Sequence, residues 1–260
     1  LKLDDTLAFR LAGELQKFDP SAFARVPGAS LSAQLSAGGQ LKPQIDAQLA
    51  LDFAPSTLMG EALTGAVKGR LQGRRLSGID IALDWAGNRL VAQGAFGGRA
   101  GKADDVLDWS LDAQRLAPLR ALTGLDLAGR ISGSGRLAGT LDAPFGTLTL
   151  AARALRLGEL GSVASADVGA ELAPGADGRI TLKLVASDLR SPSAPAPIEA
   201  VRLDIDGTRA AHRLSASVKL ADQPAERGDA PLRQSLDLAA RGALDPSGKG
   251  PSWSGRIDQL

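Results

Sequence analysis

The chain has 260 residues, with 30 basic and 29 acidic side chains and no cysteine. The lack of cysteine excludes disulfides, thiolate chemistry and cysteine-ligated metals, and the net charge of +1 gives no basis for binding nucleic acid. A hydrophobic fraction of 44% excludes bulk disorder. No apolar run approaches the roughly 18 residues of a membrane span, so neither a transmembrane helix nor a signal peptide is predicted. Because Leu1 falls within an alternating pattern, we expect a fragment of a longer protein.

The N-terminal part of the chain is predicted to form strands that each have one apolar face. Apolar and polar residues alternate over Leu7–Gly13, Leu31–Ala37 and Leu41–Phe53, which is the period of a half-buried strand. Between the first two runs, Asp19-Pro20 combines a suitable N-cap with a suitable first helical residue, so one helical turn is expected there. Residues 54–63 are interpreted as a short turn or loop.

The clearest local prediction is a β-hairpin over Ile79–Phe96. Apolar residues alternate with polar ones on both sides of Gly87-Asn88, two residues that tolerate the positive φ angles of a tight turn. With these two as the loop, the predicted cross-strand pairs are Trp85 with Leu90, Leu83 with Ala92, Ile81 with Gly94, and Ile79 with Phe96. All of these side chains then share one face, and a slip by one residue would scatter them.

The C-terminal half repeats this unit. Strands are predicted within 107–113, 125–141 and 145–150, with a helical turn over 116–122. Three further hairpins are expected: Val168, Ala170 and Leu172 with Leu184, Leu182 and Ile180; Val201, Leu203 and Ile205 with Leu220, Val218 and Ala216 around a loop at 208–213; and Leu236–Leu244 with Trp253–Ile257 around a turn at 246–251. The proline-rich stretch 191–197 is predicted to be a stiff linker or loop. No stretch keeps a helical period over three turns, so long helices are not expected.

None of the motifs that look catalytic has the surroundings that its chemistry needs. Gly133–Ala138 matches a dinucleotide fingerprint, but no helix follows it to receive a phosphate. His212 is the only histidine; it has neither a metal-ligand spacing nor a nucleophile elbow, and a structural role is favoured. The pairs Asp104-Asp105 and Asp204/Asp206 are expected in a loop and on a polar strand face. We therefore predict a protein that is not an enzyme and that uses no metal and no cofactor.

The make-up of the apolar face distinguishes two architectures. A self-packed sandwich or barrel fills its interior with bulky side chains at crystal-like density. Here many inner positions are alanine or glycine, among them Ala47, Ala92, Gly94, Gly133 and Ala216. Such a thin and repetitive apolar face favours a sheet curled around something other than protein. The pattern alone leaves both architectures open.

Several short motifs, taken in order, resemble the periplasmic region of the TamB family in the AsmA-like superfamily. The motifs are Phe18-Asp19-Pro20, Val26-Pro27-Gly28, Leu83-Asp84-Trp85-Ala86-Gly87-Asn88, Gly139-Thr140-Leu141-Asp142-Ala143-Pro144, Gly207 with His212-Arg213-Leu214, and Trp253-Ser254-Gly255. The resemblance covers nearly the whole chain. The sequence departs from the family pattern in its alanine richness and in the segment 191–197.

The resemblance implies an all-β fold: a long, twisted, U-shaped (β-taco) sheet, mostly antiparallel, with an apolar concave interior and short helical turns. It implies that residues 1–260 are a single repetitive β-groove segment of a longer periplasmic protein, anchored in the inner membrane through an upstream segment. The implied function is to carry phospholipid between the inner and outer membranes in support of outer-membrane biogenesis. The implied protein partner is a TamA-like outer-membrane barrel, which is contacted by regions outside this chain.

On this interpretation the groove is lined by the large apolar side chains that share one strand face. The residues expected to bind lipid are Leu49, Leu51, Phe53, Ile79, Ile81, Leu83, Trp85, Leu90, Phe96, Leu107, Trp109, Leu111, Leu148, Leu150, Leu182, Leu184, Leu203, Ile205, Val218, Leu236 and Leu238.

Two other functions remain open at this point. In the first, the protein is a chaperone or scaffold that works with a TamA-type barrel and captures strands of outer-membrane proteins, such as autotransporters, by strand addition. In the second, the chain is a structural β-solenoid that carries no cargo. Strand capture depends on backbone access at an edge strand, whereas lipid carriage depends on the apolar face.

Overall fold

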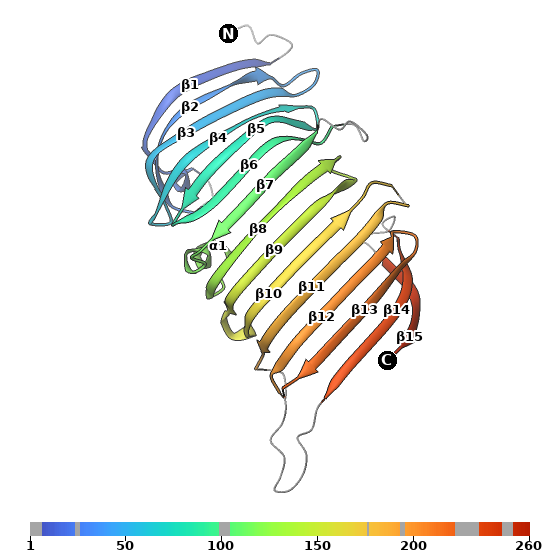
Figure 1. Cartoon of the computed structure of the whole chain (residues 1–260). Coiled ribbons are helices and arrows are strands. Elements are labelled where there is room, and N and C mark those ends of the chain that lie inside the picture. Colours follow the sequence, from blue (N-terminus) through green and yellow to red (C-terminus); the bar gives the residue numbers. More distant parts are fainter. Residues whose placement is uncertain are drawn as a thin grey trace. The chain divides into compact units, whose positions relative to one another are not determined.

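The computed structural model describes residues 7–23, 27–98, 105–175, 177–192, 196–221, 234–245 and 252–260. These residues form an all-β protein in which fifteen strands follow chain order in one sheet, each hydrogen-bonded to its neighbours in sequence (Figure 1). The ladders are antiparallel. Within the described ranges, no helix is long and apolar enough to cross a membrane. The prediction of an antiparallel all-β sheet with short helical turns is confirmed.

The chain divides into two compact units. Unit 1 comprises Leu1–Leu125 and Ser134–Pro144, and unit 2 comprises Asp126–Gly133 and Phe145–Leu260. The first seven strands belong to unit 1: β1 (Ala8–Phe18), β2 (Ala29–Gln40), β3 (Asp46–Leu58), β4 (Glu61–Gln72), β5 (Arg75–Trp85), β6 (Asn88–Phe96) and β7 (Val106–Ala113). Strand β8 (Leu127–Gly139) is divided between the units. The remaining strands are β9 (Pro144–Leu157), β10 (Ser162–Leu172), β11 (Arg179–Arg190), β12 (Ile198–Thr208), β13 (His212–Leu220), β14 (Ser235–Asp245) and β15 (Ser252–Gln259).

The two predicted helical turns are present. The 3₁₀ helix η1 (Pro20–Ala22) follows Asp19, whose Oδ1 accepts a hydrogen bond from the Ser21 N–H at 3.0 Å. This is the N-cap interaction that the sequence predicts. The 3₁₀ helix η2 (Ala117–Leu119) and the short helix α1 (Arg120–Thr123) form the second turn. A further 3₁₀ helix, η3 (Gly158–Leu160), joins β9 to β10.

The β5–β6 hairpin has the predicted face but a different register. Its loop is Ala86-Gly87, with φ angles of 57° and 78°, and not Gly87-Asn88. Trp85 therefore pairs with Asn88, and Leu83 pairs with Leu90. The predicted register is wrong by two residues. Because side chains alternate with a period of two, this shift keeps every side chain on its predicted face.

Side-chain hydrogen bonds explain why the loop moves back by one residue. The Gly87 N–H donates to Asp84 Oδ1 at 3.1 Å. The Asn88 side-chain amide donates to the Arg115 carbonyl at 2.8 Å and accepts from the Arg115 N–H at 2.9 Å. These bonds hold Asn88 in strand β6, so Ala86 takes the first turn position in spite of its positive φ.

The next two predicted hairpins differ in outcome. The predicted register of β10 with β11 is confirmed at all three pairs. In the β12–β13 hairpin, Val201 pairs with Val218 instead of Leu220, so this predicted register is also wrong by two residues. The cause is a tighter loop than predicted, closed by the Thr208 N–H, which donates to the Ala211 carbonyl at 2.8 Å.

The segment predicted as a turn or loop at 54–63 is mostly strand. Strand β3 continues to Leu58, and β4 starts at Glu61. Only Met59-Gly60 turn, with φ angles of 54° and 80°, as a two-residue hairpin loop requires. The stretches 99–104, 193–195 and 246–251, which include Asp104, the middle of the predicted linker and the last predicted turn, lie outside the described residues.

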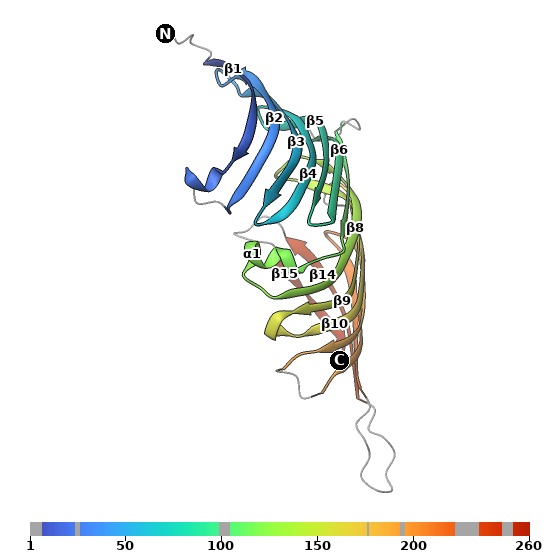
Figure 2. The same ribbon diagram turned by 90° about the vertical axis from the view of Figure 1, so that its left-hand side faces the viewer.

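Bulges bend the first strands of unit 1. The β1–β2, β2–β3 and β3–β4 ladders each contain a register shift. At the shift in β3, the buried Ser56 hydroxyl accepts a hydrogen bond from the Ser32 N–H at 2.9 Å and lies within 3.0 Å of the Ser32 and Ala54 carbonyl oxygens. Bulges increase local bending and twist, and Figure 2 shows that β1 to β4 are curved along their length.

Two glycines of β4 differ in how closely the neighbouring strand approaches them, so their substitution tests whether that close approach requires glycine. Gly65 has φ +123°, and a Cβ there would overlap the Ala82 carbonyl oxygen. A Cβ at Gly69 would meet nothing within 4 Å. We expect Gly65→Ala to destabilise the protein by about 1–3 kcal/mol, and Gly69→Ala to change stability by less than about 1 kcal/mol. Urea unfolding of both variants measures this difference; equal unfolding midpoints would contradict it.

Candidate functional site

The predicted lining residues of unit 1 share one face of its sheet. Cross-strand partners in an antiparallel ladder lie on the same face. One row of partners is Leu35, Leu51, Val67, Ile81, Ala92 and Trp109, and the next is Ala33, Phe53, Gly65, Leu83, Leu90 and Leu111. Flanking rows on this face hold Leu49, Ile79, Trp85, Phe96 and Leu107. We call these residues together the apolar face of unit 1.

The predicted residues of unit 2 also share a face. One row is Leu150, Val168, Leu184, Leu203, Ala216 and Leu238, and the next is Leu148, Ala170, Leu182, Ile205, Leu214, Ala240 and Ile257. A third row ends with Val218 and Leu236. We call these residues the apolar face of unit 2.

Both apolar faces are open to solvent. The exposed fractions of Leu49, Leu90 and Leu236 are 41%, 37% and 54%, and of the predicted residues only Phe96, at 7%, is buried; the others are half-buried. Within the described ranges, the large buried apolar side chains are Leu63, Phe96 and Leu116, and the other buried apolar residues are alanines. The self-packed sandwich that the sequence left open would bury its bulky inner residues, and the sheet observed here does not.

Several residues of these faces were missed by the site prediction. Phe9, Leu11 and Leu15 of β1 continue the rows of unit 1, because they pair with residues of β2 that lie on the apolar face. The alternation over residues 7–13 predicts a strand with one apolar face, but the predicted lining does not include this strand. The prediction also omits Val67, because glycines at i−2 and i+2 leave its strand with few large apolar side chains.

Small residues on these faces make room for large neighbours. A Cβ at Gly133 would overlap the side chain of Leu150, which therefore lies over the glycine. The indole of Trp253 likewise lies against Gly242 and Gly255. The fingerprint-like Gly133–Ala138 is thus part of strand β8, as the alternating pattern predicts, and its glycine serves packing between strands.

The single histidine has a structural environment. His212 is 7% exposed, its Nε2 accepts a hydrogen bond from the Trp253 indole N–H at 2.9 Å, and its Nδ1 lies 3.1 Å from the Thr208 carbonyl oxygen. Both ring nitrogens are therefore occupied within the fold. No group of three or more histidine, aspartate or glutamate side chains able to hold a metal occurs in the described ranges, and Asp105 is ion-paired with Arg75.

The opposite face of each unit is polar and carries exposed ion pairs. The pairs are Arg70 with Asp46, Arg136 with Asp108, Arg153 with Asp167, Arg179 with Asp206, and Lys219 with Glu199. Exposed pairs of this kind contribute only about 0–1 kcal/mol each, so their main effect is to keep this face wetted. The sheet therefore has one polar, hydrated face and one apolar face that is half-exposed.

Comparison with known proteins identifies the family. The family described as TamB, N-terminal domain, matches residues 1–260. No curated protein and no solved structure matches the chain. The family match spans all 260 residues and agrees with the motifs noted in the sequence, so the chain belongs to the TamB family.

Proposed function

We propose that this chain carries phospholipid on its apolar faces, as part of a periplasmic conduit between the inner and outer membranes that supports outer-membrane biogenesis. Membership in the TamB family supports a role in the translocation and assembly module. The observation that carries the finer proposal is the one-sided sheet, whose large apolar side chains stay half-exposed in both units. In this proposal an upstream segment anchors the protein in the inner membrane, and regions outside this chain meet a TamA-type barrel.

Hydration energies explain why a lipid would use such a surface. Each exposed CH₂ costs about 0.8 kcal/mol in water, so exposing two acyl chains costs on the order of 20 kcal/mol. An apolar sheet face removes much of this cost and leaves the headgroup in water. Contacts between acyl chains and apolar side chains have no preferred direction, so a bound chain can slide from row to row without a deep energy minimum.

The dimensions of one unit fit this cargo. The seven strands β1 to β7, spaced by about 4.8 Å, give a face of roughly 29 Å across the strands. One acyl chain spans about 15 Å, half of the roughly 30 Å hydrocarbon core of a bilayer. A lipid therefore covers only part of the face of unit 1 and has room to move along it.

Neighbouring residues of β5 provide a matched test. Leu83 lies on the apolar face, and Ala82 lies on the polar face of the same strand. We expect phospholipid to co-purify with the unmodified protein in molar amounts. The amount bound should fall at least about tenfold in Leu83→Asp, because an acyl chain that covers the carboxylate would bury an unpaired charge. It should be unchanged in Ala82→Asp. Native mass spectrometry with organic extraction measures this, and circular dichroism checks the fold.

A second variant separates lipid loss from misfolding. Leu90, in the same row as Leu83, is 37% exposed, so Leu90→Asp disturbs packing less. A lipid-free protein that also takes up no labelled phospholipid would contradict the proposal, as would equal lipid content in all three aspartate variants.

The edge strand β1 favours the second candidate function, a chaperone or scaffold that assembles outer-membrane proteins with a TamA-type barrel. Within the described ranges, β1 is paired with β2 alone, and its residues are nearly all exposed. An unpaired edge can add a strand from another protein.

Proline substitutions at Ala12 and Gly13 test strand capture. Consecutive strand residues direct their N–H groups to opposite sides, so one of the two variants removes a donor from the free edge. If the protein captures strands, that variant binds less outer-membrane protein in a pull-down and keeps its lipid. If both variants bind client protein like the unmodified chain, the scaffold function through this edge is contradicted.

A further inference from the structure

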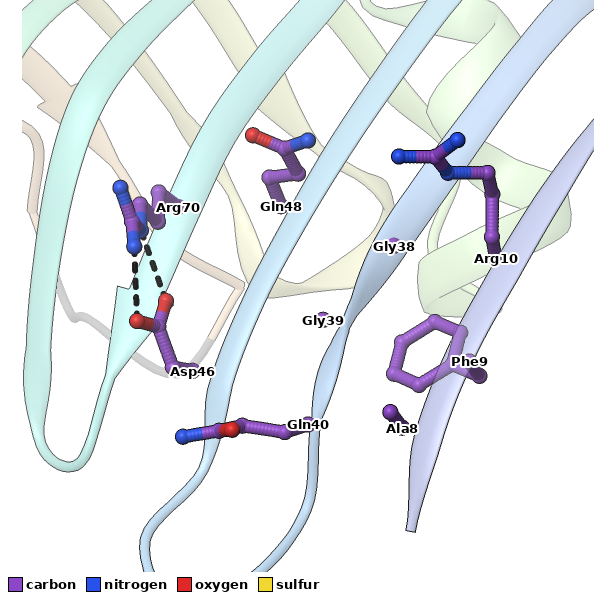
Figure 3. A pocket seen from close by; sticks show the side chains of 9 residues that line it. All are labelled: Ala8, Phe9, Arg10, Gly38, Gly39, Gln40, Asp46, Gln48 and Arg70. Atoms are coloured by element: carbon purple, nitrogen blue, oxygen red, sulfur yellow. Dashed lines mark hydrogen bonds and ion pairs between the residues drawn. The ribbon is translucent and has the colours of Figure 1, made fainter. Parts of the chain in front are cut away.

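The polar face of unit 1 contains a depression lined by hydrogen-bond donors. It has a volume of about 420 Å³ and lies over β1 to β4, with Arg10, Gln40, Gln48 and Arg70 among its lining residues. Figure 3 shows the Arg10 side chain leaning from β1 toward Gln48, with Arg70 beyond it on β4. The register places Arg10, Gly38, Gln48 and Arg70 in one row across the four strands.

Gly38 creates the space between these side chains. It lies between Arg10 and Gln48 in the row and has no side chain to fill the gap. A Cβ at this position would meet only ordinary contacts, the nearest being the Phe9 carbonyl oxygen at 3.5 Å. The depression therefore follows from the absence of a side chain and not from a tight backbone, so Gly38 can be substituted without strain.

The charges in the depression favour an anion. Asp46, the one acidic residue among the described residues that line it, accepts two hydrogen bonds of 2.7 Å from Arg70. This guanidinium lowers the pKa of the Asp46 carboxyl from its usual value, so Asp46 is already neutralised by its partner. Arg10 makes no ion pair with the described residues. One guanidinium and the two glutamine amides are thus left to bind an incoming anion, and arginine matches phosphate geometry well.

A similar arrangement recurs in unit 2. A depression of about 520 Å³ is lined by Arg213, Arg241 and Asp206, with glycines at 207 and 242. Asp206 is ion-paired with Arg179 at 3.2 Å. Arg241 is ion-paired with Asp258 at 2.7 Å, whereas Arg213 makes no ion pair with the described residues. In each unit the depression lies near the ends where odd-numbered strands begin. Each depression therefore joins one ion-paired arginine with one arginine that makes no ion pair with the described residues. The glycine between the arginines is particular to unit 1, because Gly207 and Gly242 lie in the neighbouring row with His212.

We propose that these depressions bind a phosphate group, and that its source is the headgroup of a lipid whose acyl chains lie on the apolar face; this inference rests on the proposed function. Strand β1 carries both surfaces, because Phe9 and Leu11 lie on its apolar face and are 40% and 55% exposed. Arg10 lies two residues from the start of β1, about 7 Å along the strand. A headgroup at the strand end can reach that far while its chains remain on the other face.

The test compares two lipids that differ only in the phosphoglycerol headgroup. Dioleoyl phosphatidylglycerol and dioleoylglycerol carry the same chains, and their competition for the protein in detergent is read by native mass spectrometry. The double variant Arg10→Gln/Arg213→Gln should lose about three- to tenfold of the preference for the phosphate-bearing lipid. Gly38→Glu, which puts a carboxylate into the first depression, should lower this preference in the same direction.

The matched control is Arg89→Gln/Arg202→Gln, which removes two exposed polar-face cations outside both depressions and should keep the preference. A second arm titrates glycerol phosphate by calorimetry. If glycerol phosphate binding falls in the double variant but the lipid preference does not, the site takes free phosphate and the headgroup assignment is overturned. If neither changes, the site is overturned.

Failure of the proposed function has a different signature. If neither lipid binds the unmodified protein, lipid carriage is contradicted, and the glycerol phosphate titration still tests the arginine site. Glycerol phosphate binding that is lost in the double variant and kept in the control variant would then support a phosphate site that does not bind lipid. If dioleoylglycerol and the phosphatidylglycerol bind equally well to all variants, lipid carriage stands and the headgroup site falls.

Discussion

The fold depends on the hydrogen-bond ladder of a single sheet layer. A two-layer protein is stabilised mainly by burying apolar side chains between its layers. Here the large buried apolar side chains of the described ranges are Leu63, Phe96 and Leu116, so cross-strand pairs and backbone bonds must contribute an unusual share. This explains why Gly65, whose neighbour leaves no room for a Cβ, and Ser56, whose hydroxyl satisfies the backbone at a bulge, occupy positions where other residues would be costly.

The same constraint produces the candidate site. Without a second layer, the apolar side of each strand stays half-exposed, and this is the surface that a lipid can cover. Such a surface is passive, because apolar contacts have no direction and can only equilibrate a lipid between the two ends of a face. In the proposal, polar groups near the strand ends, such as Arg10 and Arg213, orient the lipid by holding its headgroup outside the apolar face. On this account the chain guides lipid but supplies no energy for transport.

The sequence predicted strand faces better than strand registers. Alternation over Ile79–Trp85 identified the apolar face correctly, because parity survives any shift by two residues. The register at Asn88 differs from the prediction because Gly87-Asn88 is the better local turn. The hydrogen bonds of Asn88 with Arg115, distant in sequence, and of Gly87 with Asp84 favour Ala86-Gly87 instead. The depression at Arg10 could not be foreseen at all, since it needs four strands aligned in one row.

The central claim, that the apolar face contacts lipid, is tested most directly by site-specific photo-crosslinking in cells. A photoreactive amino acid is introduced in turn at Ile79, Asp80, Ile81, Ala82 and Leu83 of the full-length protein, and the crosslinked adducts are analysed for phospholipid. The account predicts lipid adducts at the three apolar-face positions and none at Asp80 and Ala82. Adducts without this alternation, or adducts to protein alone at the apolar positions, would contradict it.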